Sequence, residues 1–221
     1  SNGSGFGSTG PTVTLFDDLE GGSNGNIINN TSAVIGSWQD GGEYLTPSYY
    51  SIYSNTQAHG GSLSARQNWS NAPNPDGGAM WIGANLPSNT SSIYFSFWTY
   101  LPTGQNVPGS MISSPNWKVW WLSTNDYFQN DYASEIVTDP PSETTIAPVD
   151  GSQNRAYYGY ASFSYPKGRW VRWEGYLTAS TSTGTITLWL MDSGNTRYQL
   201  GTSTGRTIDN GTTGWNYLWF P

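Results

Sequence analysis

The chain has 221 residues, of which 10% are charged and 15% aromatic, with no cysteine and a formal net charge of −7. It is long enough to bury a substantial core, and its aromatic content argues against disorder. The negative charge, without any basic run, argues against nucleic acid as a partner. No apolar stretch approaches the roughly 18 residues of a membrane-spanning helix, so we expect no membrane insertion.

Residues 1–10 form a Gly/Ser-rich lead that we expect to be flexible, and residues 11–221 are expected to form one domain. Glycine, asparagine and proline separate runs of β-branched and aromatic residues, a pattern typical of strands joined by turns. No segment shows helical periodicity, and there is no internal repeat. The pattern therefore predicts a single β-sandwich of two antiparallel sheets.

In the first half of the chain we predict short strands over residues 12–16, 49–53, 62–69 and 79–84. The first is followed by an acidic cluster and a Gly-rich turn. The third follows a turn of two glycines that begins after His59, the only histidine in the chain. In such a turn we favour a structural role for His59 over a catalytic one.

The clearest strand is predicted over residues 93–101, where Tyr94, Trp98 and Tyr100 would share one face because side chains alternate along a strand. Residues 123–153 hold six acidic residues and no lysine or arginine. We interpret this segment as a long excursion from the compact domain, of a kind that tends to be functional.

The last part of the chain predicts a hairpin. Its strands would cover residues 169–179 and 185–191, joined by a Ser/Thr/Gly turn. A weaker strand is predicted over residues 198–201, and an aromatic strand over residues 215–220 closes the chain.

The predicted strand over residues 117–122 carries three tryptophans around Lys118. Alternation puts Lys118 and Trp120 on one face. A cation beside an indole suits a polar, ring-shaped ligand such as a sugar, and Lys118 could also neutralise a uronate carboxylate. A buried lysine paired with Glu174 on a neighbouring strand would produce the same pattern. We slightly favour the ion pair, because a lysine among indoles needs a partner.

On the predicted strand over residues 169–179, Trp170, Arg172, Glu174 and Tyr176 share one face. An arginine and a glutamate two residues apart, flanked by aromatic rings, could hydrogen-bond a sugar between stacking platforms. A salt-bridged face exposed to solvent would show the same residues, so both interpretations stay open.

Several short segments resemble known families. The sequences FDDLE (16–20), HGGSL (59–63) and YFSFW (94–98) resemble those of jelly-roll carbohydrate-binding modules. The sequences WK (117–118) and WVRWE (170–174) are similar to those of the concanavalin A-like, or LamG-like, group of lectins, glucanases and polysaccharide lyases. This resemblance implies a jelly-roll β-sandwich whose concave sheet is the glycan-binding surface.

We therefore expect non-catalytic binding of a polysaccharide, outside the cell or on a virion surface. Aromatic side chains would stack on sugar rings, and polar side chains would orient them. The expected ligand-binding residues are Lys118, Trp120, Trp170, Arg172, Glu174 and Tyr176.

An enzyme is the less favoured alternative. Glycoside hydrolysis needs two carboxylates that flank the scissile bond. The Glu-x-Asp-x-x-Glu run typical of the related glucanases is absent, which argues against a hydrolase. A polysaccharide lyase acting on a uronate polymer remains as the alternative, although the Gln-x-His and Gly-Gly-Lys patterns of related lyases are absent. Its candidate catalytic residues are Lys118, Arg172, Tyr176 and His59.

A structural Ca²⁺ site is a further expectation. Hard cations prefer several oxygen ligands, and Asp17, Asp18 and Glu20 lie close together in the sequence. The resemblance would bring them near the two glycines after His59 and near a late acid such as Asp209. A solvated acidic turn is the simpler interpretation of the same residues.

The C-terminal segment departs from the related domains, in which a further strand follows. Here the chain stops at Pro221, so the fold could close differently, a neighbouring chain could supply an edge, or the chain could be truncated. An uncovered last strand would favour a homo-oligomer. A third functional class is therefore a structural or assembly protein, such as a virion surface or filament subunit.

Overall fold

The computed structural model describes residues 14–28, 30–40, 51–67, 82–104, 116–123, 130–139, 142–150, 167–178, 180, 183–192, 197–206 and 215–220. Within these ranges the chain forms strands and no helix, and every pairing of strands is antiparallel. The expected all-β class is confirmed. No helix in this part of the chain is long and apolar enough to cross a membrane. The predicted flexible lead, residues 1–10, lies outside the described residues.

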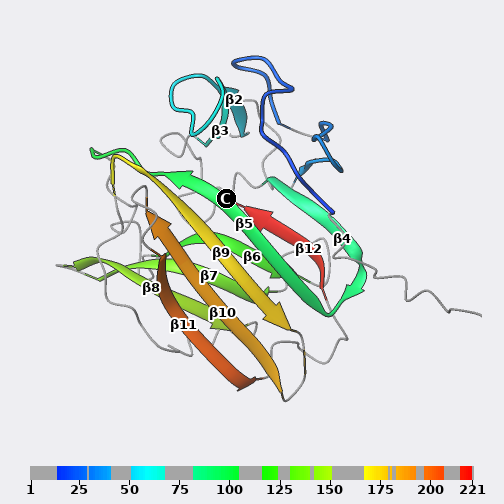
Figure 1. Cartoon of the computed structure of the whole chain (residues 1–221), viewed down its shortest axis with the longest axis vertical. Helices are drawn as coiled ribbons and strands as arrows, with labels where there is room; N and C mark the ends of the chain where they lie inside the picture. The colour runs from blue at the N-terminus through cyan, green and yellow to red at the C-terminus, as the bar shows by residue number, and fades with distance from the viewer. Residues whose placement is uncertain are drawn as a thin grey trace, which may run out of the picture.

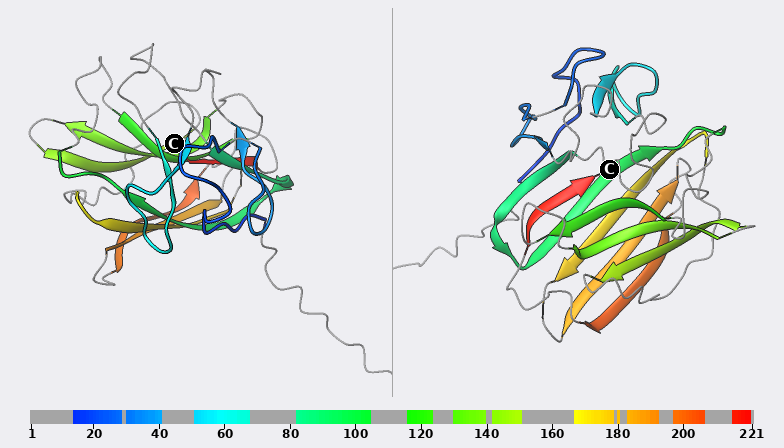
Figure 2. Two further views of the ribbon diagram at one scale, coloured as in Figure 1. Left: turned by 90° about the horizontal axis from the view of Figure 1, so that it is seen from above. Right: turned by 180° about the vertical axis from the view of Figure 1, so that it is seen from behind.

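Two sheets make up most of the molecule (Figure 1). The larger has the order β1 (Gln39–Asp40), β4 (Ile82–Thr90), β12 (Trp215–Phe220), β6 (Asn116–Ser123), β7 (Asn130–Asp139) and β8 (Ser142–Asp150). The smaller has the order β11 (Arg197–Arg206), β10 (Gly184–Asp192), β9 (Trp170–Thr178) and β5 (Ser92–Tyr100). A separate pair joins β2 (Ile52–Ser54) to β3 (Ser64–Arg66). Figure 2 shows the two large sheets as two layers.

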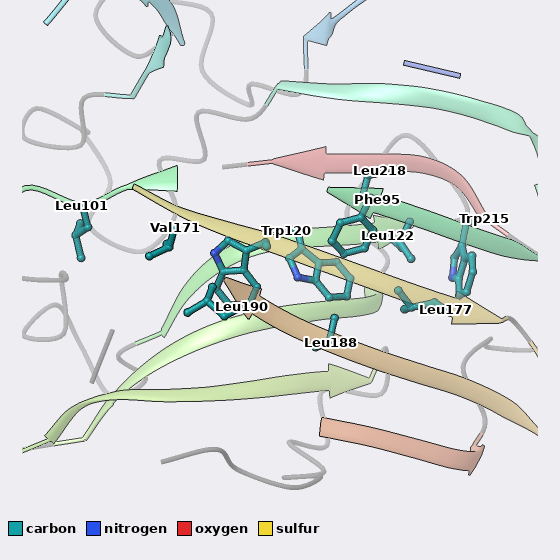
Figure 3. Packing of buried hydrophobic residues seen from close by; sticks show 11 residues of the cluster. Phe95, Leu101, Trp120, Leu122, Val171, Leu177, Leu188, Leu190, Trp215 and Leu218 are labelled. Atoms are coloured by element: carbon teal, nitrogen blue, oxygen red, sulfur yellow. The ribbon is translucent and has the colours of Figure 1, made fainter. Parts of the chain in front are cut away.

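The main core lies between these two layers (Figure 3). Trp120 from the larger sheet and Phe95 from the smaller one meet with their ring centroids 4.7 Å apart. Each such fully buried apolar side chain stabilises the fold by about 1.5–3 kcal/mol. The core residues are Phe95, Leu101, Trp120, Leu122, Val171, Trp173, Leu177, Leu188, Leu190, Trp215 and Leu218.

Gly175 in β9 leaves space in this core for the ring of Phe95. The two residues are direct partners across the β5–β9 pairing. A Cβ atom at position 175 would overlap the phenyl ring of Phe95. The glycine therefore lets an aromatic ring lie directly on the neighbouring strand.

A second, smaller core belongs to the N-terminal lobe, which we define as residues 14–40 and 51–67. It contains Trp38 and Tyr53, and Phe220 at the end of β12 packs against both this core and the main one. The ring of Phe220 lies 6.2 Å from that of Trp38 and 4.6 Å from that of Phe97. Phe220 therefore joins the lobe to the two sheets.

Two expectations about the strands are wrong. Residues 123–153 were expected to be a long excursion, but they contain both strands of the hairpin of β7 and β8. Among the described strands β8 lies at an edge of the larger sheet, where a proline such as Pro148 is tolerated because one side of the strand has no neighbour in this part of the chain. Of the strand expected over residues 12–16, the described part shows only an isolated bridge between Phe16 and Ile35.

Of the alternatives left open for the C-terminus, an uncovered last strand is not observed. The strand β12 pairs with β4 on one side and β6 on the other, so it is an internal strand of the larger sheet. Tyr217, Leu218 and Trp219 have ladder partners on both sides. The strand β12 therefore gives no support to a homo-oligomer formed through an uncovered last strand.

Candidate functional site

The strands β5 and β9 present a row of aromatic and polar residues on the side of the smaller sheet that faces away from the core. Phe95 and Trp173 point into the core, so their even-numbered neighbours point outward. The pairing sets Tyr100 opposite Trp170, Trp98 opposite Arg172, Ser96 opposite Glu174 and Tyr94 opposite Tyr176. We call these eight residues the aromatic face.

One end of the aromatic face is closed by rings from two parts of the chain. The ring centroids of Tyr100 and Trp170 lie 5.5 Å apart. The imidazole of His59 stacks on the indole of Trp98, with a centroid separation of 3.7 Å and an interplanar angle of 19°. It also meets Trp170 edge-on at 5.6 Å. Four ring systems therefore gather at this end.

His59 comes from the connection between β2 and β3 in the N-terminal lobe. Its side chain stays exposed although it stacks on Trp98. Partial burial lowers the pKa of the imidazole from its ordinary value of 6.5, because burial disfavours the charged form. The neutral imidazole is therefore the main form at pH 7.

The centre of the aromatic face is an ion pair between Arg172 and Glu174. The side chain of Glu174 is only 5% exposed and that of Arg172 is 31% exposed. The guanidinium also lies 5.7 Å from the ring centroid of Trp98, a cation–π distance. The Nε atom of Arg172 is buried and has no hydrogen-bond partner among the described residues. Glu174 thus compensates the charge of Arg172 within the protein.

The other end of the aromatic face is open to solvent. Tyr94 and Tyr176 are 60% and 43% exposed, and they lie directly opposite each other. Tyr94 and Tyr100 are six positions apart along β5, a distance of about 20 Å in an extended strand. Aromatic rings therefore stand at both ends of a long surface whose middle is polar.

Trp120 does not belong to this surface, and its expected role in ligand binding is wrong. It is fully buried in the main core, where it packs on Phe95 (Figure 3). Its strand, β6, lies in the larger sheet, whereas Arg172 and Glu174 lie in the smaller one. A break in the β6–β7 register between Lys118 and Trp120 also interrupts the simple alternation expected for this strand.

The expected pairing of Lys118 with Glu174 on a neighbouring strand is not supported, because β6 and β9 are not neighbours. The backbone of Lys118 pairs with that of Glu135 in β7, and Glu174 forms its ion pair with Arg172. The side chain of Lys118 lies outside the described part of the structure.

The predicted Ca²⁺ ligands Asp17, Asp18 and Glu20 form hydrogen bonds with protein groups. Asp17 accepts from the indole N–H of Trp38 and, at 3.1 Å, from the backbone N–H of Leu19. Asp18 accepts from the backbone N–H of Glu20 at 3.1 Å. Within the described ranges, no group of three or more His, Cys, Asp or Glu side chains could hold a metal ion. The fourth expected ligand, Asp209, lies outside those ranges, and the Ca²⁺ site stays a prediction.

Sequence reasoning did not include Trp98, Tyr100, Tyr94 and Ser96 in the site. Alternation had already placed the three aromatic residues on one face of their strand. The missing information was the β5–β9 pairing, which sets that face beside Trp170 and Arg172. Strand pairing is a long-range property, and no local pattern in the sequence encodes it.

The larger sheet carries a second aromatic pair on its outer side. The rings of Tyr217 and Trp219 stack at 5.6 Å with an interplanar angle of 10°. Trp219 is only 6% exposed, and a Cβ atom on Gly83 would overlap its ring. Trp219 is therefore much less accessible to a ligand than Tyr94 and Tyr176 on the aromatic face.

No protein-family model matches the chain, and no curated protein gives a significant match to its sequence. The geometry of the aromatic face is therefore the basis for inferring a function.

Proposed function

We propose that the chain binds a polysaccharide without cleaving it, on the aromatic face of the smaller sheet. The observation that supports this proposal is the combination of ring systems and one buried ion pair on the same surface. Tyr100 and Trp170 would stack on the apolar faces of sugar rings, beside Trp98, on which His59 is stacked. Arg172 and Glu174 would donate to and accept from sugar hydroxyls.

The length of the aromatic face favours a polymer over a single sugar. Its two ends are about 20 Å apart, which is room for several sugar rings in a row. The exposed Tyr94 and Tyr176 would supply a second stacking platform at the end opposite Trp170. A chain that spans both platforms would gain contacts that a short ligand lacks.

The proposal extends to the fold and the setting. Two antiparallel sheets packed face to face are compatible with a jelly-roll sandwich of the concanavalin A-like kind, which we propose for this chain. A glycan-binding role fits a location outside the cell or on a virion surface.

Titration of the intrinsic tryptophan fluorescence with a panel of soluble neutral and uronate polysaccharides tests this function. We expect saturable binding to at least one of them, and the Trp170→Ala variant should bind at least about tenfold more weakly. Tyr217→Ala, on the other sheet, should bind like the original chain. Absence of binding across the panel, or equal losses in both variants, would contradict the proposal.

A polysaccharide lyase acting on a uronate polymer is the second candidate, and one observation favours it. A mainly neutral imidazole, as a general base requires, lies on the same indole as the Arg172 guanidinium. However, Glu174 already compensates the charge of Arg172, so a uronate carboxylate would have to compete for it. Binding without cleavage is therefore preferred. Ultraviolet absorbance of unsaturated products from the same uronate polysaccharides would reveal lyase activity.

A further inference from the structure

The carboxylate of Glu20 lies at the surface, yet it accepts three hydrogen bonds from other groups of the protein. Its carboxylate accepts from the backbone N–H of Ser62 at 2.7 Å, from the hydroxyl of Ser62 at 2.6 Å and from the backbone N–H of Leu63 at 2.8 Å. The groups it joins are 42 and 43 residues apart in sequence. Glu20 therefore fastens one part of the N-terminal lobe to the start of the segment that forms β3.

The backbone around Gly61 is shaped to admit this carboxylate. Gly61 has a φ of +67°, a conformation that residues with side chains rarely adopt. A Cβ atom at this position would overlap Oε1 of Glu20. The turn and the carboxylate are thus packed directly against each other.

This turn immediately follows His59. The imidazole lies on Trp98 at 3.7 Å and meets Trp170 at 5.6 Å, yet it is exposed and belongs to a different part of the chain from β5 and β9. An exposed loop needs an anchor to keep one of its side chains stacked on a remote strand. On the C-terminal side of His59 the nearest such anchor is the set of hydrogen bonds from Ser62 and Leu63 to Glu20, which we call the Glu20 clasp. On its N-terminal side the hydroxyl of Ser64 donates to the backbone carbonyl of Gln57.

We propose that Glu20 is a positioning residue, which fixes the turn at residues 60–63 so that His59 forms the end wall of the polysaccharide site beside Trp98 and Trp170. The part of this inference that concerns the ligand rests on the proposed function. The part that concerns the placement of His59 does not, and it can be tested without any ligand.

The first test uses the fact that the chain has a single histidine. The NMR signals of the His59 ring protons should lie upfield of their position in an unfolded chain, because the ring stacks on an indole. Trp98→Ala should remove this shift, which identifies its source.

Two variants then break the clasp from opposite sides. Glu20→Gln replaces the carboxylate by an amide, and Gly61→Ala forces a side chain into the space that Glu20 occupies. In both, the His59 signals should move toward their unfolded position while the indole signals stay dispersed. Asp18→Asn is the matched control. It also removes one negative charge, but it keeps a side-chain oxygen that can accept from the backbone N–H of residue 20. Unchanged His59 signals in both clasp variants would overturn the proposal, even if one of them folds poorly.

The second test measures affinity for the polysaccharide that the chain binds most tightly. His59→Ala and Glu20→Gln should each weaken binding by about three- to tenfold, the effect of losing one aromatic contact. The double variant should lose little more than either single one, because both changes remove the same wall. Additive losses, or no loss in Glu20→Gln, would overturn the positioning role in ligand binding. If Trp170→Ala still weakens binding in that case, the proposed function stands and only this inference fails.

Discussion

At the scale of single residues, the most constrained group on the aromatic face is Glu174. A carboxylate that is almost fully buried must be compensated, and Arg172 is its ion-pair partner. The side chain of Arg172 contacts Glu174, lies near the indole of Trp98 and is partly exposed to solvent. The contribution of this ion pair should be visible in the stability of the fold.

The pair can be tested with a double-mutant cycle. Arg172→Met should lower the free energy of unfolding by about 2–4 kcal/mol, below the cost for a fully buried pair because the arginine is 31% exposed. Glu174→Gln should cost less, about 1 kcal/mol, since the freed guanidinium can turn toward water. Urea unfolding followed by tryptophan fluorescence should show a double variant that costs less than the sum of the two single variants. Strictly additive costs would mean that the two side chains do not interact.

Glu20 predicts a specific dependence of stability on pH. The hydroxyl of Ser62, and then the backbone N–H groups of Leu63 and Ser62, lower the pKa of Glu20 from its ordinary value of 4.5. A carboxylate with a depressed pKa in the folded state adds stability above the unfolded pKa and loses it as the pH falls through the folded one. The unfolding midpoints of the original chain and of Glu20→Gln should therefore differ most above pH 4.5 and converge below it. A difference that stays constant down to low pH would contradict this assignment, and Asp18→Asn measured in parallel controls for loss of a surface charge.

At the scale of elements, the strands with dense aromatic alternation were predicted well. The expected strands over residues 93–101, 117–122 and 215–220 correspond closely to β5, β6 and β12. The predicted hairpin corresponds to β9 and β10. These segments are recognisable because burial on one face selects apolar residues at every second position.

The hairpin of β7 and β8 was missed for a physical reason. Its acidic residues and Pro148 are unfavourable in a central strand, so local composition argued for a loop. Among the described strands β8 lies at an edge of the larger sheet, where Pro148 and the acidic residues of β8 cost little and discourage pairing with other chains. The acidic residues of β7 lie in an internal strand, between β6 and β8, and the edge position does not account for them. The composition that a strand tolerates depends on its position in the sheet, and local sequence does not show that position.

The pairing of β5 with β9 depends on Gly175, and its replacement makes a second element-scale prediction. Gly175→Ala should lower the free energy of unfolding by about 1–3 kcal/mol, because the added methyl group collides with the ring of Phe95. Phe95→Leu should offset part of that loss in the double variant. Gly104→Ala, where an added Cβ atom meets nothing within 4 Å, is the matched control in the same unfolding measurement. Equal costs at both glycines would show that Phe95 does not lie on Gly175.

At the scale of the whole molecule, the proposed binding surface combines the aromatic face with His59, which comes from another part of the chain. The smaller sheet provides Trp98, Trp170, Arg172 and Glu174, and the N-terminal lobe adds His59. Contacts through Phe220 hold the lobe against the two sheets. The chain thus assembles one surface from segments that are more than a hundred residues apart.

The sequence could identify half of this surface. Alternation correctly placed Trp170, Arg172, Glu174 and Tyr176 on one face of one strand. It could not show that β5 lies beside that strand, that β6 belongs to the other sheet, or that the ring of His59 stacks on Trp98. Each of these facts depends on how strands pair and on which layer they join, and local patterns do not determine either.

The most direct test of the central claim is an NMR titration of the isotope-labelled chain with an oligosaccharide cut from the polysaccharide it binds. The signals that change on binding should come from β5 and β9, from the indoles of Trp98 and Trp170 and from the single histidine. Those of Tyr217 and Trp219, on the outer side of the larger sheet, should stay in place. Changes confined to the larger sheet, with β5 and β9 unaffected, would contradict the assignment of the binding surface.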